Sequence, residues 1–169
     1  MICWYSLEVR VPFRDAVSAS SPLIAEFELI REVRLVDTDS TGFAHFSSYV
    51  RMMEETEYAF LRSRGLRVVL YDERGTMGFP RLHVSISIFA PVSFGEQVLV
   101  KLKLTELDGK QVTYCFDICN QQGDVIVEGI FRAAFCRFPD DAPPFAILIP
   151  DFVTTALTGS PDLIPETQA

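Results

Sequence analysis

The sequence predicts an α+β fold in which one long helix packs on an antiparallel sheet. Four segments alternate apolar with polar residues at a period of two, the pattern of strands with one buried face, and a fifth, later segment has apolar residues on both faces. One segment between the first and second of them repeats its apolar residues at helical spacing instead. At 169 residues, the chain has the length of one domain of ordinary size. We therefore expect a single core between one helix and one sheet.

The first predicted strand covers residues 27–35. Phe27, Leu29, Val33 and Leu35 alternate with charged residues along this segment. The strand should run directly into a polar loop that begins at Asp37.

The predicted helix runs from about residue 47 to residue 64. Its core-facing side should be one narrow stripe that consists of Tyr49, Met52, Met53, Thr56 and Phe60. Ser47 or Ser48 is a suitable N-cap, and Gly65 can end the helix. At about 100° per residue, three charged side chains should point away from the stripe: Arg51, Glu54 and Glu57.

Four strands are predicted after the helix. In the first, residues 82–88, alternation places Leu82, Val84, Ile86 and Ile88 on one buried face. Residues 98–104 and 112–118 repeat the pattern around a turn signal at 108–109. The last, residues 125–137, has apolar residues on both faces, so it should be central in the sheet. The final three strands should form an antiparallel meander.

The two ends of the chain fit this pattern less well and suggest three parts. Residues 1–22 contain only a short alternation and are expected to be an N-terminal extension. Residues 23–138 are expected to form the domain. Residues 139–169 contain six prolines and are expected to be a Pro-rich C-terminal extension that lies on or off the domain.

Charge and hydropathy exclude several classes of partner. A formal net charge of −8 argues against a surface that binds nucleic acid, which needs many cations facing the phosphates. No apolar stretch approaches the roughly 20 residues that span a bilayer, and residues 1–22 lack the apolar core of a signal peptide. We therefore expect a cytoplasmic protein without membrane insertion.

Cysteine spacing predicts neither a metal site nor a disulfide framework. The four cysteines, Cys3, Cys115, Cys119 and Cys136, form no C-x-x-C pair with nearby histidines. We expect free and mostly buried thiols, with no metal and no cofactor.

The loop before the predicted helix carries the most informative motif. Residues 37–49 read DTDSTGFAHFSSY, and the helix continues as VRMMEE over residues 50–55. This pattern resembles the signature of the 4-hydroxybenzoyl-CoA thioesterase family of hot-dog proteins, in which an Asp-x-Asp-x-x-Gly loop leads into a long helix. The similarity extends more loosely through FAPV at 89–92 and GEQV at 95–98, and so covers roughly residues 27–137. It implies a hot-dog fold, one long helix wrapped by a five-stranded antiparallel sheet, and hydrolysis of an acyl-CoA thioester.

The resemblance assigns the catalytic carboxylate to Asp39. In the family, the second Asp of the loop acts on the thioester carbonyl as nucleophile or as base for water. A thioester carbonyl is electrophilic enough for one carboxylate and one oxyanion donor to suffice. The family's donor is a backbone N–H at the start of the helix, which matches Phe46. Asp37 is expected to shape the loop instead, and Asp39 without this motif would be read as a turn or capping residue.

Other residues near the motif are candidates for lesser roles. His45 could orient water or line the acyl pocket, or it could be structural. Gly42 supplies a backbone conformation that a Cβ would oppose, and Ser48 stands where the family often has Asn. A second branch of hot-dog thioesterases uses a helix glutamate, so Glu54 and Glu55 could form a carboxylate pair or simply a solvated helix face. Gly42, Ser48 and Glu54 are the candidate substrate contacts here.

An acyl-CoA substrate needs cations for its phosphates, even on an acidic protein. Lys110 lies just after the 108–109 turn, where relatives place basic phosphate contacts. Lys101, Lys103 and Arg137 are further candidates. Acyl carrier protein is an alternative carrier of the thioester.

Two other functions are compatible with the motif. A hot-dog dehydratase or hydratase would use a histidine, such as His45, with a carboxylate from the partner subunit. A dimeric acyl-thioester-binding module would bind without turnover. In each case we expect a homodimer or a dimer of dimers, because a five-stranded sheet around one helix leaves an open edge that a second copy can cover.

Overall fold

The computed structural model describes residues 23–159. The elements in chain order are β1 (Ala25–Glu32), the 3-10 turn η2 (Leu35–Asp37), α1 (Phe46–Ser63), β2 (Val69–Asp72), β3 (Gly75–Gly78), β4 (Arg81–Ile88), β5 (Gln97–Asp108), β6 (Gln111–Cys119), β7 (Val125–Ala134), β8 (Cys136–Phe138), β9 (Phe145–Ala146) and α2 (Asp151–Thr158). The predicted extension over residues 1–22, Cys3 and the last ten residues lie outside the described part.

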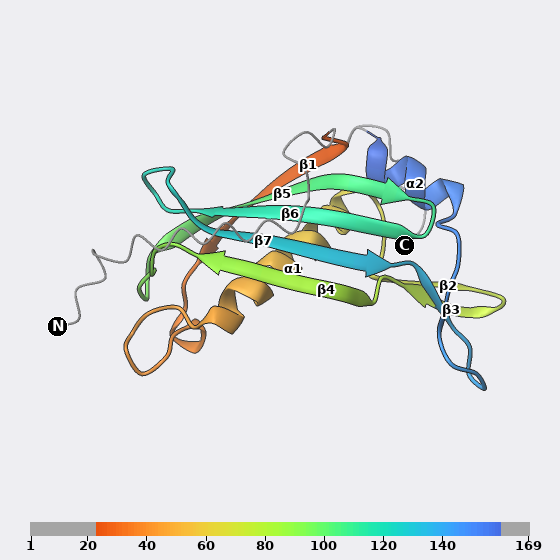
Figure 1. Cartoon of the computed structure of the whole chain (residues 1–169), viewed down its shortest axis with the longest axis horizontal. Helices are drawn as coiled ribbons and strands as arrows, with labels where there is room; N and C mark the ends of the chain where they lie inside the picture. The colour runs from red at the N-terminus through yellow and green to blue at the C-terminus, as the bar shows by residue number, and fades with distance from the viewer. Residues whose placement is uncertain (1–22, 160–169) are drawn as a thin grey trace.

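The main sheet has five strands in the order β1-β5-β6-β7-β4, and all neighbours are antiparallel (Figure 1). The meander β5-β6-β7 is confirmed, and β7 lies between β6 and β4 as its apolar composition predicted. Val98, Val100, Leu102 and Leu104 on β5 are at most 2% exposed, which confirms the alternation in that strand. The predicted α+β architecture is therefore correct.

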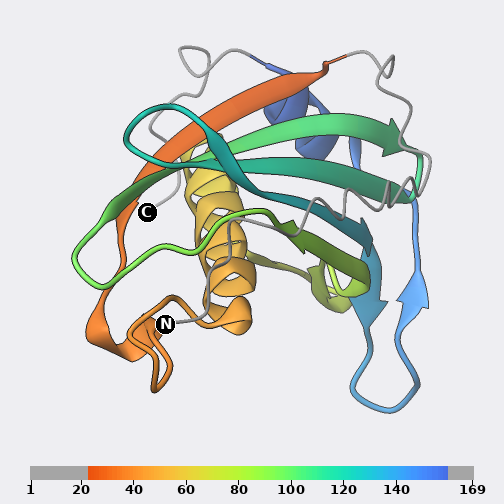
Figure 2. The ribbon, with the colours of Figure 1, turned by 60° about the vertical axis from the view of Figure 1, so that its left-hand side comes forward.

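Helix α1 lies inside the curve of this sheet (Figure 2) and packs against β1, β5 and β7. The whole predicted stripe, from Tyr49 to Phe60, is at most 1% exposed. At Gly129 on β7, an added Cβ would lie 2.4 Å from Cε of Met53 on α1. Glycine at this position lets a long methionine side chain reach the sheet backbone.

The ends of α1 differ partly from the prediction. The N-cap is His45 rather than Ser47 or Ser48, and its ring nitrogen accepts from the Ser47 N–H at 3.4 Å. At the other end Gly65 has a φ of 69°, and the Leu66 N–H donates to the Leu61 carbonyl at 2.9 Å. Gly65 therefore ends the helix in a left-handed conformation, as predicted.

Three strand predictions need correction. The first strand stops at Glu32, and Leu35 lies in η2 with 74% of its surface exposed. The predicted strand over 125–137 is divided, because β7 ends at Ala134 and β8 pairs with β3 in a different sheet. On β4, Leu82 is 59% exposed at a register shift between Arg81 and His83, and Val84 is 42% exposed because β4 is an edge strand that the helix only partly covers.

Glu57 is buried, although helical spacing placed it on the solvent side. It is 1% exposed, and its carboxylate forms a two-point ion pair with the guanidinium of Arg81 at the start of β4. The same guanidinium lies 4.5 Å from the ring centroid of Phe131. A paired, hydrogen-bonded cation is the condition under which a carboxylate tolerates such burial.

A second sheet, in the order β2-β3-β8-β9, extends the molecule at the end where β4 begins (Figure 1). Asp72 on β2 and Arg137 on β8 form an ion pair across this sheet, with two contacts of 2.6 Å. The hydrogen bonds from Arg137 lower the pKa of Asp72 to about 2. The sequence predicts no strand between the long helix and residue 82, and it offers Arg137 as a candidate phosphate contact. Within this chain Arg137 is engaged by Asp72.

Part of the Pro-rich segment packs on the domain. Ile149, Val153 and Leu157 are at most 7% exposed and belong to the main core. The three cysteines within residues 23–159 are free, and Cys119 and Cys136 are buried. Over the same residues, no helix is both long and apolar enough to cross a membrane.

Candidate active site

The Asp39 loop is a short hairpin. Thr38 and Ala44 form an antiparallel bridge, and the Asp39 N–H donates to the Phe43 carbonyl at 2.9 Å. Gly42 closes the turn with a φ of 83°, a conformation that a side chain would oppose, as predicted.

This hairpin is also fastened to the segment that follows β4. The Ala44 N–H donates to the Val92 carbonyl at 2.8 Å, and Phe43 forms a bridge with Ser93. The loop is therefore held by backbone hydrogen bonds on two sides.

Asp39 is exposed to solvent, and its carboxylate is held mainly by Thr41. Both the N–H and the hydroxyl of Thr41 donate to Oδ1, at 2.8 and 2.5 Å. The Thr41 hydroxyl, then its N–H, and the nearby His45 hold the pKa of Asp39 below its usual value. Asp39 is consequently ionised at neutral pH, as a base or nucleophile must be.

Phe46 is the first residue of α1, at the point where the hairpin returns. A backbone N–H in the first turn has no acceptor within the helix, and the helix dipole adds a partial positive charge there. No acceptor for the Phe46 N–H is found among residues 23–159. This donor is thus free to receive an oxyanion.

His45 lies between these two groups in sequence. Its Nδ1 is 2.8 Å from the Ser47 hydroxyl, and its ring centroid is 4.3 Å from that of Phe46. The imidazole is exposed and acts electrostatically on Asp39. A role of His45 in the reaction stays a prediction.

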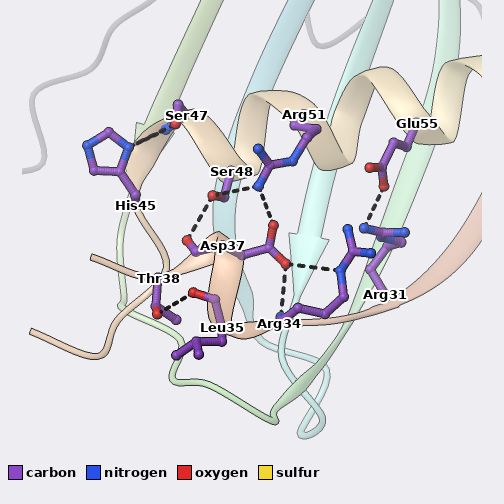
Figure 3. A network of polar contacts seen from close by, with 10 residues as sticks. All are labelled: Arg31, Arg34, Leu35, Asp37, Thr38, His45, Ser47, Ser48, Arg51 and Glu55. Carbon is purple, nitrogen blue, oxygen red and sulfur yellow. Dashed lines mark hydrogen bonds and ion pairs between the residues drawn. The ribbon is translucent and has the colours of Figure 1, made fainter. Parts of the chain in front are cut away.

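Asp37 anchors the loop to the helix (Figure 3). Its carboxylate is fully buried and accepts from the Arg34 N–H at 2.9 Å and from the guanidinium of Arg51. Its carbonyl accepts from the Ser48 hydroxyl at 2.8 Å and from the His45 N–H at 2.9 Å. Burial alone would raise the pKa of Asp37, but the bonds from Arg34 and Arg51 outweigh it and lower the pKa.

Ser48 is 2% exposed, and its hydroxyl donates to the backbone carbonyl of Asp37. It connects the base of the hairpin to the first turn of α1, next to the free N–H of Phe46. A direct contact between Ser48 and a substrate stays a prediction.

Glu54 lines a cavity of about 250 Å³ beside α1, at the start of β4. The cavity walls are Glu54, Glu57, Tyr58, Leu61, Val68, Phe79, Pro80 and Arg81. Tyr58 donates a 2.9 Å hydrogen bond to one oxygen of Glu54. Glu55 instead forms a 2.6 Å ion pair with Arg31 on β1 (Figure 3). The two glutamates therefore point to different neighbours and do not form a carboxylate pair.

Lys110 lies at the opposite end of the sheet from Asp39. The hairpin follows the end of β1, which pairs with the start of β5 at Gln97, whereas Lys110 follows the end of β5 at Asp108. A strand of that length spans about 35 Å. Within one subunit, Lys110 and Asp39 are separated by the whole sheet.

Three polar residues at or near this loop were not predicted to belong to the site. Thr41 bonds to Asp39, and Arg34 and Arg51 bond to Asp37. The Asp39-x-Thr41 spacing was a usable signal, since Asp and Thr two residues apart commonly bond to nearby backbone. Nothing local indicated that Arg34 and Arg51 would meet at Asp37.

The arrangement can be compared with known proteins. The family model "Thioesterase superfamily" matches residues 41–127, from the loop through the first part of β7. The chain belongs to the thioesterase superfamily. A 1,4-dihydroxy-2-naphthoyl-CoA hydrolase of Synechocystis sp. is 32% identical over 91 residues, which is 54% of this chain and 64% of that relative. The matched part thus spans less than two thirds of that relative.

Two more known proteins are similar to this chain. A 1,4-dihydroxy-2-naphthoyl-CoA hydrolase of Rippkaea orientalis is 25% identical over 104 residues, covering 60% of this chain and 75% of that relative. The crystal structure of a 1,4-dihydroxy-2-naphthoyl-CoA thioesterase from Synechocystis superposes with a TM-score of 0.68 at 22% identity, covering 79% of this chain and 96% of that one. The predicted hot-dog fold is confirmed.

Proposed function

We propose that this thioesterase superfamily member hydrolyses acyl-CoA thioesters, with Asp39 as the catalytic carboxylate. The supporting observation is that a bonded hairpin carries an exposed, ionised carboxylate and leads directly into α1, whose Phe46 N–H has no acceptor among residues 23–159. A thioester carbonyl placed between them would meet a base or nucleophile on one side and an oxyanion donor on the other. His45 would orient water or line the acyl pocket.

Two balanced routes fit this arrangement. As a base, Asp39 takes a proton from water, and the hydroxide adds to the carbonyl carbon while Phe46 N–H binds the oxyanion. Collapse then breaks the C–S bond, and the thiolate takes the proton from Asp39. As a nucleophile, Asp39 forms a mixed anhydride and expels the thiolate, and water then cleaves the anhydride. Both routes convert one thioester and one water to an acid and CoA.

We further propose a homodimer formed by antiparallel pairing of β4 with its copy. The outer edge of β4 has no neighbour in the main sheet. Val84 and Ile88 pair with Phe131 and Val127, which are buried against α1, so all four side chains point to the helix side. Val84 is 42% and Ile88 is 45% exposed in the single chain. A second copy would cover both this apolar strip and the open strand edge.

Such pairing would build the active site from two subunits. Antiparallel strands would bring the start of one β4, with its cavity, beside the end of the other, whose following Val92 is bonded to the Asp39 hairpin. Glu54 and Lys110 would then serve the Asp39 of the other subunit. This would remove the difficulty that Lys110 is a sheet length away within its own chain.

The relatives favour an aromatic acyl group. Two of them are named as hydrolases of 1,4-dihydroxy-2-naphthoyl-CoA, a ring system with hydroxyl groups. The cavity offers Phe79 and Tyr58 to a ring, and Glu54 as acceptor for a hydroxyl. We therefore propose a hydroxylated aromatic acyl-CoA as substrate.

The test is release of free CoA over a panel of thioesters. The panel should contain a hydroxynaphthoyl-CoA, 4-hydroxybenzoyl-CoA, short and long aliphatic acyl-CoAs, one acyl carrier protein thioester and one enoyl-CoA. Free CoA is followed by chromatography, which measures the product itself. Fastest hydrolysis of hydroxyaryl-CoA supports the proposal. Hydration of the enoyl-CoA, or binding without turnover, would refute it.

A further inference from the structure

The contacts of the Asp39 carboxylate are asymmetric. Oδ1 accepts two hydrogen bonds from Thr41, from the N–H at 2.8 Å and from the hydroxyl at 2.5 Å. Within residues 23–159, both hydrogen bonds formed by this carboxylate end on Oδ1, and the backbone of Phe43 acts on it more weakly. One oxygen is therefore committed to the loop, whereas Oδ2 receives neither of these bonds.

Two donors on one oxygen restrict the carboxylate in a way that one donor cannot. The backbone N–H belongs to a hairpin that is bonded on two sides, so it is a fixed reference point. The hydroxyl adds a second contact to the same oxygen, which limits rotation of the carboxylate plane about the Cβ–Cγ bond. Such restraint matters because small misplacement of a reacting group can cost about a hundredfold in rate.

We propose that Thr41 is a positioning residue that occupies Oδ1 of Asp39, so that Oδ2 is the oxygen that reacts. This inference rests on the proposed thioesterase function and specifies its reacting atom. Oδ2 is the atom that takes the proton from water, or that bonds to the carbonyl carbon, in the steps written above.

The proposal implies a pH signature. The Thr41 hydroxyl lowers the pKa of Asp39, so its loss should raise that pKa and move the acid limb of the pH profile of kcat/KM upward. The titratable neighbour that acts on Asp39 is His45. From the segment after β4, the nearest charge is Glu96, whose carboxylate accepts from the Ser93 N–H at 2.5 Å. Neither changes when the hydroxyl is removed.

The experiment compares Thr41→Val with Thr41→Ser, using the full chain and its fastest thioester. Valine keeps the shape without the hydroxyl, and serine restores the hydroxyl. For Thr41→Val we expect kcat on the pH plateau to fall about tenfold or more, with KM within about twofold, and the acid limb to move to higher pH. Thr41→Ser should stay within about threefold of the unmodified protein. Ser40→Ala, at the exposed neighbouring position, is the matched loop control.

Several results would overturn the inference. Unchanged plateau kcat and acid limb in Thr41→Val would show that the hydroxyl only closes the turn. Equal loss in Thr41→Ser would show that the γ-methyl, and not the hydroxyl, matters. If the unmodified protein released no CoA from any thioester, the proposed function itself would fail, and this inference with it. A thermal melt of each variant separates lost positioning from lost folding.

Discussion

At the scale of single residues, Asp39 and Asp37 have opposite environments only two positions apart. Asp39 is exposed and bonded to its own loop, whereas Asp37 is fully buried and bonded to Arg34 and Arg51. The first environment suits a group that must meet a substrate, and the second suits an anchor. Substitutions at the two positions should therefore affect different measurements.

Asp39→Asn should abolish most turnover without unfolding the protein. The amide keeps the size of the side chain and can still accept from Thr41, but it cannot take a proton or attack a carbonyl. We expect kcat to fall at least about a hundredfold, with the melting temperature nearly unchanged because the side chain is exposed. Single-turnover kinetics with the fastest substrate is the measurement. Activity within a few-fold of the original would shift attention to Glu54 and His45.

Asp37→Asn should cost stability rather than turnover. The change weakens charge-assisted hydrogen bonds from Arg51 and the Arg34 N–H, each of which contributes about 1.5–3 kcal/mol, so we expect a loss in that range by urea denaturation. The pKa of Asp37 is lowered in the folded state. Its contribution is hence present above the ordinary carboxyl pKa and is lost as pH falls below it. The stability difference between the two proteins should shrink on acidification, and a constant difference would contradict this reading.

At the scale of elements, helix α1 packs closely on the sheet at Gly129, where Met53 contacts the strand. A Cβ there would lie 2.4 Å from Cε and 2.7 Å from Sδ of Met53. Both atoms belong to the flexible end of a side chain, so Met53 can move at a moderate cost.

Gly129→Ala should therefore destabilise the protein by about 1–3 kcal/mol, the usual effect of overpacking. Met53→Ala removes the clashing atoms but leaves a cavity, so it should be destabilising alone. In the double variant, the alanine methyl at position 129 no longer meets the sulfur, and the sum of the single effects should overestimate the loss. Urea denaturation of all four proteins gives the cycle. If the two losses of stability were additive, Met53 and position 129 would not interact.

At the scale of the whole molecule, the open edge of β4 and the separation of Lys110 from Asp39 both favour a dimer. Charge distinguishes the two edge strands of the sheet. β1 carries glutamates at 26, 28 and 32, which oppose pairing with another strand, whereas β4 has no acidic residue and alternates His83, Ser85 and Ser87 with apolar residues.

Val84→Lys should break the proposed dimer and lower activity together. Near a two-fold axis the new charge would lie close to its own copy in an apolar strip, where like charges repel and lose hydration. Ile30→Lys is the control, since Ile30 is 66% exposed on the other edge strand. Light scattering gives the mass, and the CoA assay at the same concentrations gives the activity. A monomer of Val84→Lys with full activity would contradict a site shared between subunits.

Local sequence was enough to place α1, the meander and the candidate catalytic carboxylate. Strand and helix periods are properties of neighbouring residues, and Gly65 and the 108–109 turn act within a few positions. The loop motif could be read because its backbone bonds are also local, from Asp39 to Phe43 and from Gly42 to Asp39. Its role in catalysis stays a prediction.

Only the tertiary structure revealed the contacts between segments that are distant in the sequence. Glu57 looked solvent-facing until Arg81, 24 positions later, was found to pair with it. Leu82 and Val84 looked buried because alternation reports the polarity of a face but not what covers it. Leu82 lies at a register shift of β4, and Val84 lies on an edge strand with a neighbouring strand on one side only. The prolines of the C-terminal segment concealed α2, whose Val153 and Leu157 enter the core. In each case burial depends on which elements meet, and no local period contains that information.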